Sequence, residues 1–276
     1  MALCLWYLRL EKLILMKDSN ICIGIILFNP TNDEINSLIR LTNENNVYVY
    51  VNSNIDNEVK SVLHEKTKYI YCSNVNFGIS KAMNHLFAES KKDGFKYFMC
   101  LDQDTIINDD FSICEIEKEI FNINAKFLEH DFLGYNLNSS ENQYSFQDFI
   151  IISGTIFNLE ILQKMGFFNE NYFVDLVDYE ISIRASVFKY KFINLLNNKF
   201  FDHKSNQADT LHSIFCFTVR TRRYEYSRIK QSILSYMNLL FFSIKKLQIY
   251  LFIKLFRSFL IYIYFRLISI FPIKDS

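Results

Sequence analysis

The run Tyr97-Phe98-Met99-Cys100-Leu101-Asp102-Gln103-Asp104 decides the fold of this chain and locates its chemistry. An apolar run of strand length ends abruptly in two carboxylates that lie two positions apart. Residues two apart in an extended segment point to the same side, so both acids are expected to face one cleft. Hard divalent cations such as Mg²⁺ and Mn²⁺ take oxygen ligands and bridge readily to phosphate. The pattern therefore predicts a metal- or phosphate-binding edge, although an Asp-x-Asp pair also occurs in many solvated loops.

Strand and helix patterns alternate on the N-terminal side of this run. A capping box, Thr31 to Glu34, precedes the first amphipathic stretch. The expected strands are 21–28, 47–51, 69–72 and 95–101, and the expected helices begin after Thr31, span 57–66 and run from about 78 to 91. This alternation predicts an α/β fold with a Rossmann-like, mostly parallel sheet and helices on both faces. Ligands of such sheets bind beyond the carboxyl ends of the strands, so we expect the site in the loops after Phe28, Val51, Cys72 and Leu101.

The second half of the chain is less regular and predicts a small α+β lobe. We expect a helix near 111–124, a strand at 149–153, a short helix at 159–165 and a helix at 177–188. A soft boundary near Ser213 divides the chain into an N-terminal extension (1–20), an α/β domain (21–213) and a basic, amphipathic helical C-terminal region (214–276). The extension lacks a basic start and a small-residue cleavage site, so it is not typical of a signal peptide.

The composition indicates a densely packed, folded chain. Half of the 276 residues are hydrophobic, with 28 Phe and 17 Tyr against only 2 Pro and 6 Gly, which excludes disordered and collagen-like chains. The six cysteines form no Cys-x-x-Cys pair and have no histidines at metal spacing. They are therefore expected to be reduced, as in a cytoplasmic protein.

The charge is distributed unevenly. From Arg220 to Ser276 there are eleven Lys or Arg residues and two acids, a net charge of +9, so the remainder carries about −9 within a neutral chain. The basic residues are spaced singly among large apolar ones, as on a helix that lies in a membrane interface. An ordinary packed helical pair with snorkelling lysines is the alternative. No stretch reaches the roughly 18 uncharged apolar residues that span a bilayer.

A second acidic block lies between Phe167 and Arg184 and reads FFNENYFVDLVDYEISIR. Its acids lie just before and within the first turn of an expected helix. A carboxylate held there can take the proton of an attacking hydroxyl as a general base. The simpler roles are that Asp178 favours the positive end of the helix and that Glu180 pairs with Arg184 four positions on. We favour the catalytic role for Asp178 and the structural role for Glu180.

Several short motifs follow one another along the chain in this order: Asn76-Phe77-Gly78, Asp102-Gln103-Asp104, Ser153-Gly154, and Asp178-Tyr179-Glu180 with Arg184. This set resembles family 2 glycosyltransferases, and most closely their bacterial rhamnosyltransferase-like branch. In that branch an Asp-Gln-Asp metal motif and a Phe-Ile-Asp-x-x-Asp-x-Glu-like block are usual, and here 173–180 reads FVDLVDYE. The resemblance covers roughly 21–228. It implies a GT-A type fold, a nucleotide-sugar donor, Mg²⁺ or Mn²⁺, and an inverting single displacement.

The resemblance also implies residue roles. Asp104 would be the principal metal ligand, Asp102 would lie nearer the ribose and diphosphate, and Asp178 would be the base. His203 matches a late histidine that touches the metal or the diphosphate, although a lone histidine is more often structural. The other donor-binding residues implied are Phe28, Asn29, Asn52, Asn54, Asn76, Gly78, Lys81 and Gln103. The acceptor-side residues implied are Ser153, Gly154, Asp175, Glu180 and Arg184.

Two features of the motifs qualify these roles. Asn76-Phe77-Gly78 opens a helix, so its backbone N–H groups can meet phosphate or ribose oxygens, or can form a simple turn. The chain also departs from the family pattern. Asn52 and Asn54 stand where an aspartate often binds uracil or thymine. Lys204 follows His203 where glycine is commoner, and Ile229 follows Arg228 where asparagine is common.

The sequence thus predicts transfer of a sugar, such as L-rhamnose from dTDP-rhamnose, to a glycan or lipid-linked acceptor. The setting would be synthesis of a bacterial surface polysaccharide, lipopolysaccharide O-antigen or capsule, at the inner face of the cytoplasmic membrane. A UDP-hexose or UDP-N-acetylhexosamine donor is the nearest alternative. A degenerate membrane-peripheral protein that binds nucleotide sugars without turnover is another. A nucleotidyltransferase fits poorly because no glycine-rich basic loop follows the first strand, and no nucleic-acid partner is expected.

Overall fold

The computed structural model describes residues 19–108, 110–137, 143–196, 201–203, 210–214, 217–221 and 224–268. Between 201 and 221, and at Ile268, the description covers the backbone only. The expected N-terminal extension therefore lies almost wholly outside the described residues.

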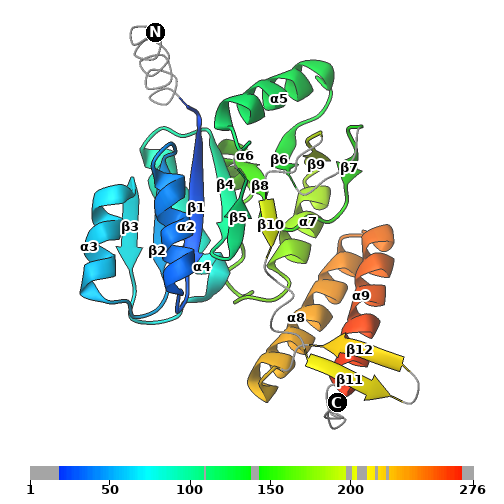
Figure 1. The fold of residues 1–276 in the computed structure, drawn as a ribbon. Helices are drawn as coiled ribbons and strands as arrows, with labels where there is room; N and C mark the ends of the chain where they lie inside the picture. Colours follow the sequence, from blue (N-terminus) through cyan, green and yellow to red (C-terminus); the bar gives the residue numbers. More distant parts are fainter. Residues whose placement is uncertain are drawn as a thin grey trace, which may run out of the picture.

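One eight-stranded sheet forms the centre of the molecule (Figure 1). Its strand order is β3-β2-β1-β4-β8-β6-β9-β7, and the first four of these strands are parallel. The antiparallel β8 separates this half from the parallel pair β6 and β9. In sheet order the strands are β3 (Tyr69–Cys72), β2 (Val47–Val51), β1 (Ile21–Leu27), β4 (Tyr97–Asp102), β8 (Thr155–Asn158), β6 (Phe132–Asn136), β9 (Lys191–Asn194) and β7 (Phe146–Gln147). The predicted Rossmann-like, mostly parallel sheet is confirmed.

Helices cover both faces of the sheet because the strands are apolar on both sides. In β2, Val47, Val49 and Val51 pack with α2, α3 and α5, whereas Tyr48 and Tyr50 pack with α4, α6 and α7 on the other face. The first three helices are α2 (Asn32–Thr42), α3 (Asn57–Lys66) and α5 (Ile113–Lys126). The second three are α4 (Gly78–Lys92), α6 (Leu159–Lys164) and α7 (Val177–Val187). Strands buried on both faces are typical of doubly wound α/β proteins.

Most of the predicted elements are confirmed, including the capping box of Thr31 and Glu34 at the start of α2. The strand predicted at 149–153 is wrong. These residues form a loop whose backbone groups bind side chains of α7 instead of a neighbouring strand. The Ile150 N–H donates to Ser182 Oγ at 3.2 Å, and the Ile152 N–H donates to Asp178 Oδ1 at 3.0 Å. The sheet strand follows the loop, at β8.

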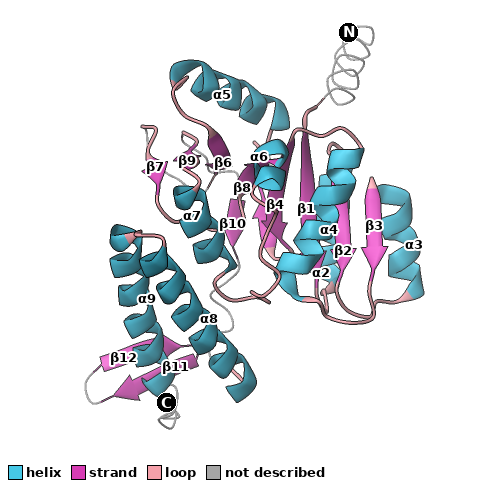
Figure 2. Ribbon diagram, turned by 180° about the vertical axis from the view of Figure 1, so that it is seen from behind, coloured by secondary structure: helices cyan, strands magenta, loops and turns pink. Residues whose placement is uncertain are grey.

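The C-terminal region packs against the α7 face of the sheet. Its helices are α8 (Tyr226–Lys245) and α9 (Ile249–Ile268), which lie side by side beyond α7 in both views (Figures 1 and 2). Tyr236, Leu239, Leu251 and Leu255 are buried in the same core cluster as α7. The two small sheets are β10 (Phe201–His203) with β5 (Thr105–Ile107), and β11 (Thr210–Ile214) with β12 (Phe217–Thr221). Ser213, the expected domain boundary, lies inside β11.

The α8–α9 pair is amphipathic as predicted. While one side is buried in the core, large apolar side chains on the other side are exposed. They include Phe241, Leu247, Tyr250, Ile253 and Leu260, each at least half exposed. Across the described residues, none of the helices combines the length and the apolar character needed to cross a bilayer.

Candidate active site

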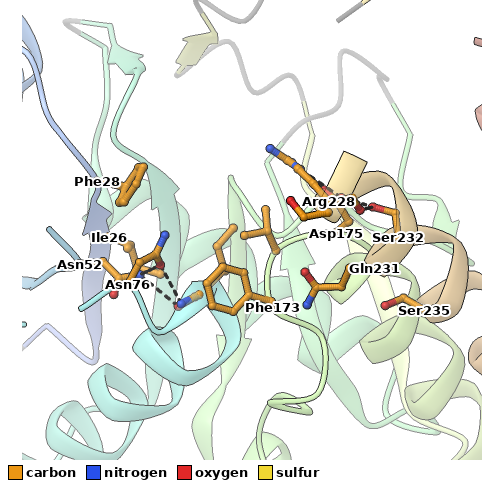
Figure 3. Close-up of a pocket in the computed structure, with 14 residues that line it drawn as sticks. Ile26, Phe28, Asn52, Asn76, Phe173, Asp175, Arg228, Gln231, Ser232 and Ser235 are labelled. Atoms are coloured by element: carbon orange, nitrogen blue, oxygen red, sulfur yellow. Dashed lines mark hydrogen bonds and ion pairs between the residues drawn. The ribbon is translucent and has the colours of Figure 1, made fainter. Parts of the chain in front are cut away.

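Two adjoining cavities lie at the carboxyl end of the parallel strands, where the strand order reverses between β1 and β4. Ile26 of β1 is paired directly with Asp102 of β4 at this point. We call the first the acid cavity; it has a volume of about 400 Å³ and contains Asp102, Gln103, Asp104, Ser153 and Asp178 in its wall. We call the second the α8 cavity; it has a volume of about 440 Å³ and is lined by Asn52, Asn76, Gly78, Asp175, Arg228 and Gln231, among others (Figure 3). Ile26, Phe28, Ile79 and Val174 line both. Both cavities therefore lie at the carboxyl ends of the strands, where the sequence predicted ligand binding, and at a topological switch point.

Gln103 fastens the loop after β1 to the loop after β4. Its Oε1 accepts a hydrogen bond from the Phe28 N–H at 2.7 Å, and its Nε2 donates to the Phe28 carbonyl and to Glu34 Oε1, both at 3.3 Å. These bonds hold the apolar Phe28 ring beside the two acids. Gln103 thus lies in the acid cavity as predicted, but its amide is engaged within the protein and shapes the site.

The two residues Ile152 and Ser153 connect the two candidate catalytic acids. Ser153 Oγ accepts a hydrogen bond from the Asp102 N–H at 3.0 Å, while the preceding residue binds Asp178 through its backbone N–H. Gly154 follows with a left-handed φ of 78° and donates its N–H to the Cys100 carbonyl at 2.8 Å. Ser153 lines the cavity, whereas Gly154 lies outside the lining and turns the chain. The Ser153-Gly154 motif therefore fixes the separation of Asp102 from Asp178.

Asp178 has the electrostatic character of a general base. It lies in the first turn of α7, and its Oδ2 has no hydrogen-bond partner among the described residues, so one oxygen is fixed and the other is free. Burial raises the pKa of Asp178 to about 7, and the neighbouring Asp102 carboxylate adds to the increase, against the lowering effect of the Ile152 N–H. A carboxylate with a pKa near the working pH is suited to accept a proton.

The acid cavity offers two carboxylates to a cation. Within the described side chains no three His, Cys, Asp or Glu residues are grouped for a metal ion. Asp102 and Asp104 do line the same cavity, and Mg²⁺ commonly binds one or two carboxylates together with substrate phosphates and water. The two carboxylates therefore fit a cation that substrate phosphates and water would complete. The backbone of His203 pairs with Thr105, next to Asp104, but its side chain lies outside the description.

The loop that begins α4 has its backbone N–H groups engaged within the protein. Phe77 donates to Asn52 Oδ1 at 2.8 Å, Gly78 to Asn76 Oδ1 at 2.9 Å and Ile79 to the Phe173 carbonyl at 2.6 Å. These bonds are those of the simple turn, the alternative that the sequence left open. Gly78 has a φ of 79°, and a Cβ there would lie 2.4 Å from the Phe173 carbonyl oxygen, so only glycine fits.

Asn52 is structural for the same reason. It is buried, and its Nδ2 donates to Asn76 Oδ1 at 2.8 Å while its Oδ1 accepts from Phe77. Both ends of its amide hold the β3–α4 turn, and Asn52 is also in the wall of the α8 cavity. Asn76 and Gly78 still line the α8 cavity.

Three other predicted donor-binding residues lie outside both cavity linings. Asn29 has a left-handed φ of 47° and donates its N–H to Ser53 Oγ at 2.8 Å, so it makes a turn. Asn54 is exposed on the loop after β2. The Lys81 ammonium lies 4.2 Å from the centre of the Phe77 ring, in a cation–π contact on the surface. The structure therefore brings none of these three side chains to the wall of either cavity.

Glu180 and Arg184 are also structural. Arg184 Nε lies 2.8 Å from Glu180 Oε1, and both side chains are buried. The Arg184 guanidinium also donates to the carbonyls of Met165 and Phe167, so it joins α7 to the end of α6. The expected i,i+4 pair is present, and both residues line a separate, open pocket with Asn84 and Gly166 and not the acid cavity.

Asp175 connects the acidic block to α8. It accepts hydrogen bonds from Arg228 Nη2 at 2.7 Å, from Arg228 Nε at 3.2 Å and from Ser232 Oγ. Burial alone would raise the pKa of Asp175, but these donors outweigh it and lower the pKa. Sequence analysis missed Ser232 and the rest of the α8 wall. The available signal was the recurrence of Ser227, Ser232 and Ser235 in the first half of an amphipathic helix.

Comparison with known proteins gives one curated relative. No family model matches the chain. The chain is 29% identical over 192 residues to the dTDP-rhamnosyl transferase RfbF of Shigella flexneri. That match covers 61% of this chain and 64% of that protein. The chain thus spans less than two thirds of the length of that relative. This similarity supports the classification of the chain as a glycosyltransferase.

Among solved structures, the mannose-1-phosphate geranyltransferase from Thermus thermophilus has a TM-score of 0.34 and 8% sequence identity. That match covers 66% of this chain and 76% of the other. A likeness at this level defines neither the fold nor the activity of this chain.

Proposed function

We propose that this chain is a family 2, GT-A type glycosyltransferase that moves a sugar from a nucleotide-sugar donor to an acceptor hydroxyl with inversion. The observation that carries the proposal is the acid cavity itself. Asp102, Asp104 and Asp178 line one cavity at the switch point of a doubly wound sheet, and the pKa of Asp178 is raised toward neutrality. Paired acids for a metal diphosphate and a separate base are the two requirements of this chemistry.

The reaction follows from these positions. Asp178 Oδ2 accepts the proton of the acceptor hydroxyl as its oxygen forms a bond to the anomeric carbon of the donor sugar. The bond from that carbon to the diphosphate oxygen breaks, and the nucleoside diphosphate leaves with the electron pair. Asp102 and Asp104 would hold Mg²⁺ or Mn²⁺, which neutralises the charge that develops on the leaving diphosphate. The Ile152 and Ser153 contacts keep the base and the metal-binding acids at a fixed separation.

The donor that we favour is dTDP-L-rhamnose. The support is the relative in Shigella flexneri, whose printed name is a dTDP-rhamnosyl transferase, together with the Asp-Gln-Asp motif and the block at 173–180. The acceptor would be a glycan or a lipid-linked oligosaccharide in bacterial surface polysaccharide synthesis.

We also propose that the α8–α9 pair lies on the inner face of the cytoplasmic membrane. Phe241, Leu247 and Ile253 are exposed there, each by 60% or more, and Lys245 and Lys246 are exposed beside them. Apolar side chains with basic neighbours suit an interface of anionic lipids. Co-sedimentation of the full chain with vesicles that contain phosphatidylglycerol should exceed that with pure phosphatidylcholine. Replacing Phe241, Leu247 and Ile253 together by Asp should abolish it, and equal partitioning of both forms would contradict the proposal.

The enzymatic proposal is tested by thermal shift across a panel of nucleotide sugars, with and without Mn²⁺. A ligand that binds only the folded state raises the melting temperature. We expect one donor to stabilise the protein selectively and only with the metal, and that donor to be consumed when an acceptor is added. Folded protein that responds to none of the donors would reject the proposal in favour of a binding protein without turnover.

A further inference from the structure

One wall of the α8 cavity comes from a helix outside the α/β domain. Ser227, Gln231 and Ser235 follow one another at intervals of four residues on α8, so they lie along one face of the helix. All three line the cavity, opposite the loops that follow β1, β2 and β3 (Figure 3). A helix that only packed on the domain would present apolar residues here, as it does at Tyr236 and Leu239.

Gln231 stands out along this wall because its amide is unused. It forms no hydrogen bond with any residue that the structure describes, and Figure 3 shows it directed into the cavity beside Phe173. The other amides on the two cavities are engaged: Asn52 and Asn76 bind each other, and Gln103 binds Phe28 and Glu34. Gln231 therefore offers both a free N–H donor and a free carbonyl acceptor.

The order of chemical groups along the two adjoining cavities indicates which part of the donor lies in the α8 cavity. Asp102 and Asp104, which suit the diphosphate, lie in the acid cavity, and Asp178 with the loop at 151–153 forms the side where transfer occurs. The donor sugar must lie toward Asp178. The nucleoside must then extend the other way, past Ile26 and Phe28, into the α8 cavity.

We propose that Gln231 binds the nucleobase of the donor and sets its specificity, a role that rests on the proposed function above. Its carboxamide matches the imide edge of thymine or uracil, where an N–H lies beside a carbonyl oxygen, so two parallel hydrogen bonds form. Phe28 and Ile79 supply the apolar surface that the rest of the ring needs. Gln231 thus takes the place of Asn52, whose amide is closed off in the β3–α4 turn.

The neighbouring ion pair keeps Gln231 at the cavity. Arg228, one turn before it, is bound to Asp175 through two hydrogen bonds, and Ser232 binds the same carboxylate. Asp175 lies three residues before the candidate base. Helix α8 is therefore fixed to the loop that leads into the first turn of α7, where Asp178 lies.

The test compares Gln231→Leu with Asn238→Leu, because Asn238 is an exposed amide on the same helix that lines neither cavity. Calorimetric titrations with Mn²⁺ would use dTDP, UDP and inorganic pyrophosphate, after circular dichroism confirms that both variants fold. Losing a pair of hydrogen bonds of about 1 kcal/mol each weakens binding by a factor of ten or more. We expect that loss for dTDP or UDP with Gln231→Leu, no change for pyrophosphate, and none for Asn238→Leu.

The outcomes separate the two proposals. If the natural protein binds neither dTDP nor UDP, the proposed function fails and this inference fails with it. If the natural protein binds one of them and Gln231→Leu binds it equally well, only this inference is overturned. An equal loss for pyrophosphate and the nucleotide would also overturn it, because the effect would then lie at the diphosphate.

Discussion

Asp178→Asn tests the electrostatics of the site most directly. The substitution keeps the shape of the side chain and an oxygen that can accept the Ile152 N–H, so the loop contact persists. The asparagine side chain does not titrate, so the pH dependence that Asp178 causes is lost. Moving the pKa of an aspartate from 3.8 to about 7 corresponds to on the order of 4 kcal/mol, an upper bound because the side chain is partly exposed. Between about pH 4 and pH 7 the folded protein holds a proton that the unfolded chain has lost. The free energy of unfolding should therefore fall as the pH rises through this window.

The assay is urea denaturation at pH 4.5 and pH 7.5 in metal-free buffer, where no cation alters the pKa of Asp178. The natural protein should lose stability between the two values by more than Asp178→Asn does, by roughly 1 to 4 kcal/mol. Transfer by the variant should fall by a factor of 10² to 10⁴, the usual contribution of a general base, while donor binding persists. Equal pH dependence of the two proteins would refute the raised pKa. Near-normal transfer would refute the role of base.

Three further predictions concern the metal, the turn and the helix. Asp104→Ala should abolish metal-dependent donor binding, and unchanged donor affinity in a calorimetric titration with Mn²⁺ would contradict the metal assignment. Gly78→Ala should cost roughly 2 kcal/mol or more in urea denaturation, because a Cβ meets the Phe173 carbonyl. Gly94 has a φ of 90° and open space around it, so Gly94→Ala should lower the free energy of unfolding by less. Equal losses for the two variants would mean that the positive φ, and not the contact with Phe173, causes the loss. Arg228→Met should change stability by no more than about 1 kcal/mol, since its ion pair is partly exposed. It should weaken nucleoside diphosphate binding, and unaltered binding would show that α8 needs no such anchor.

The parallel half of the sheet could be predicted from the sequence because its signals are local. Each strand is a short apolar run followed by a turn and an amphipathic helix, and β2, α3 and β3 have the predicted limits. The second half lacks such signals. The apolar run at 149–153 resembles a strand, yet Ile151 is 58% exposed and faces the acid cavity. The hydrogen bonds of this run go to side chains of α7, and sequence patterns do not record such a tertiary choice.

The candidate site was predictable to the same extent. Asp102, Asp104 and Asp178 follow from short motifs, because each lies within a few residues of the strand end or helix start that positions it. Asn52 was predicted to bind the base from its residue type and position, while its hydrogen-bond partners depend on how the β3–α4 loop folds back. Gln231 lies 53 residues beyond Asp178, and only the packing of α8 brings it to the cavity. When residues from separate segments meet at a site, the structure is needed to identify them.

The joined cavities explain why the C-terminal helices are part of the site. Asp175 and Asp178 lie on one short segment, and that segment is held at two points, by α8 through Arg228 and by the 151–153 loop through Ile152. A displacement of α8 would therefore move the base relative to Asp102 and open the α8 cavity at the same time. Helix α8 thus contributes a wall to the second cavity, while Tyr250, Ile253 and Leu260 of its neighbour α9 are exposed. Under the proposed function, movements of α8 would thus couple occupancy of the second cavity to the position of the base.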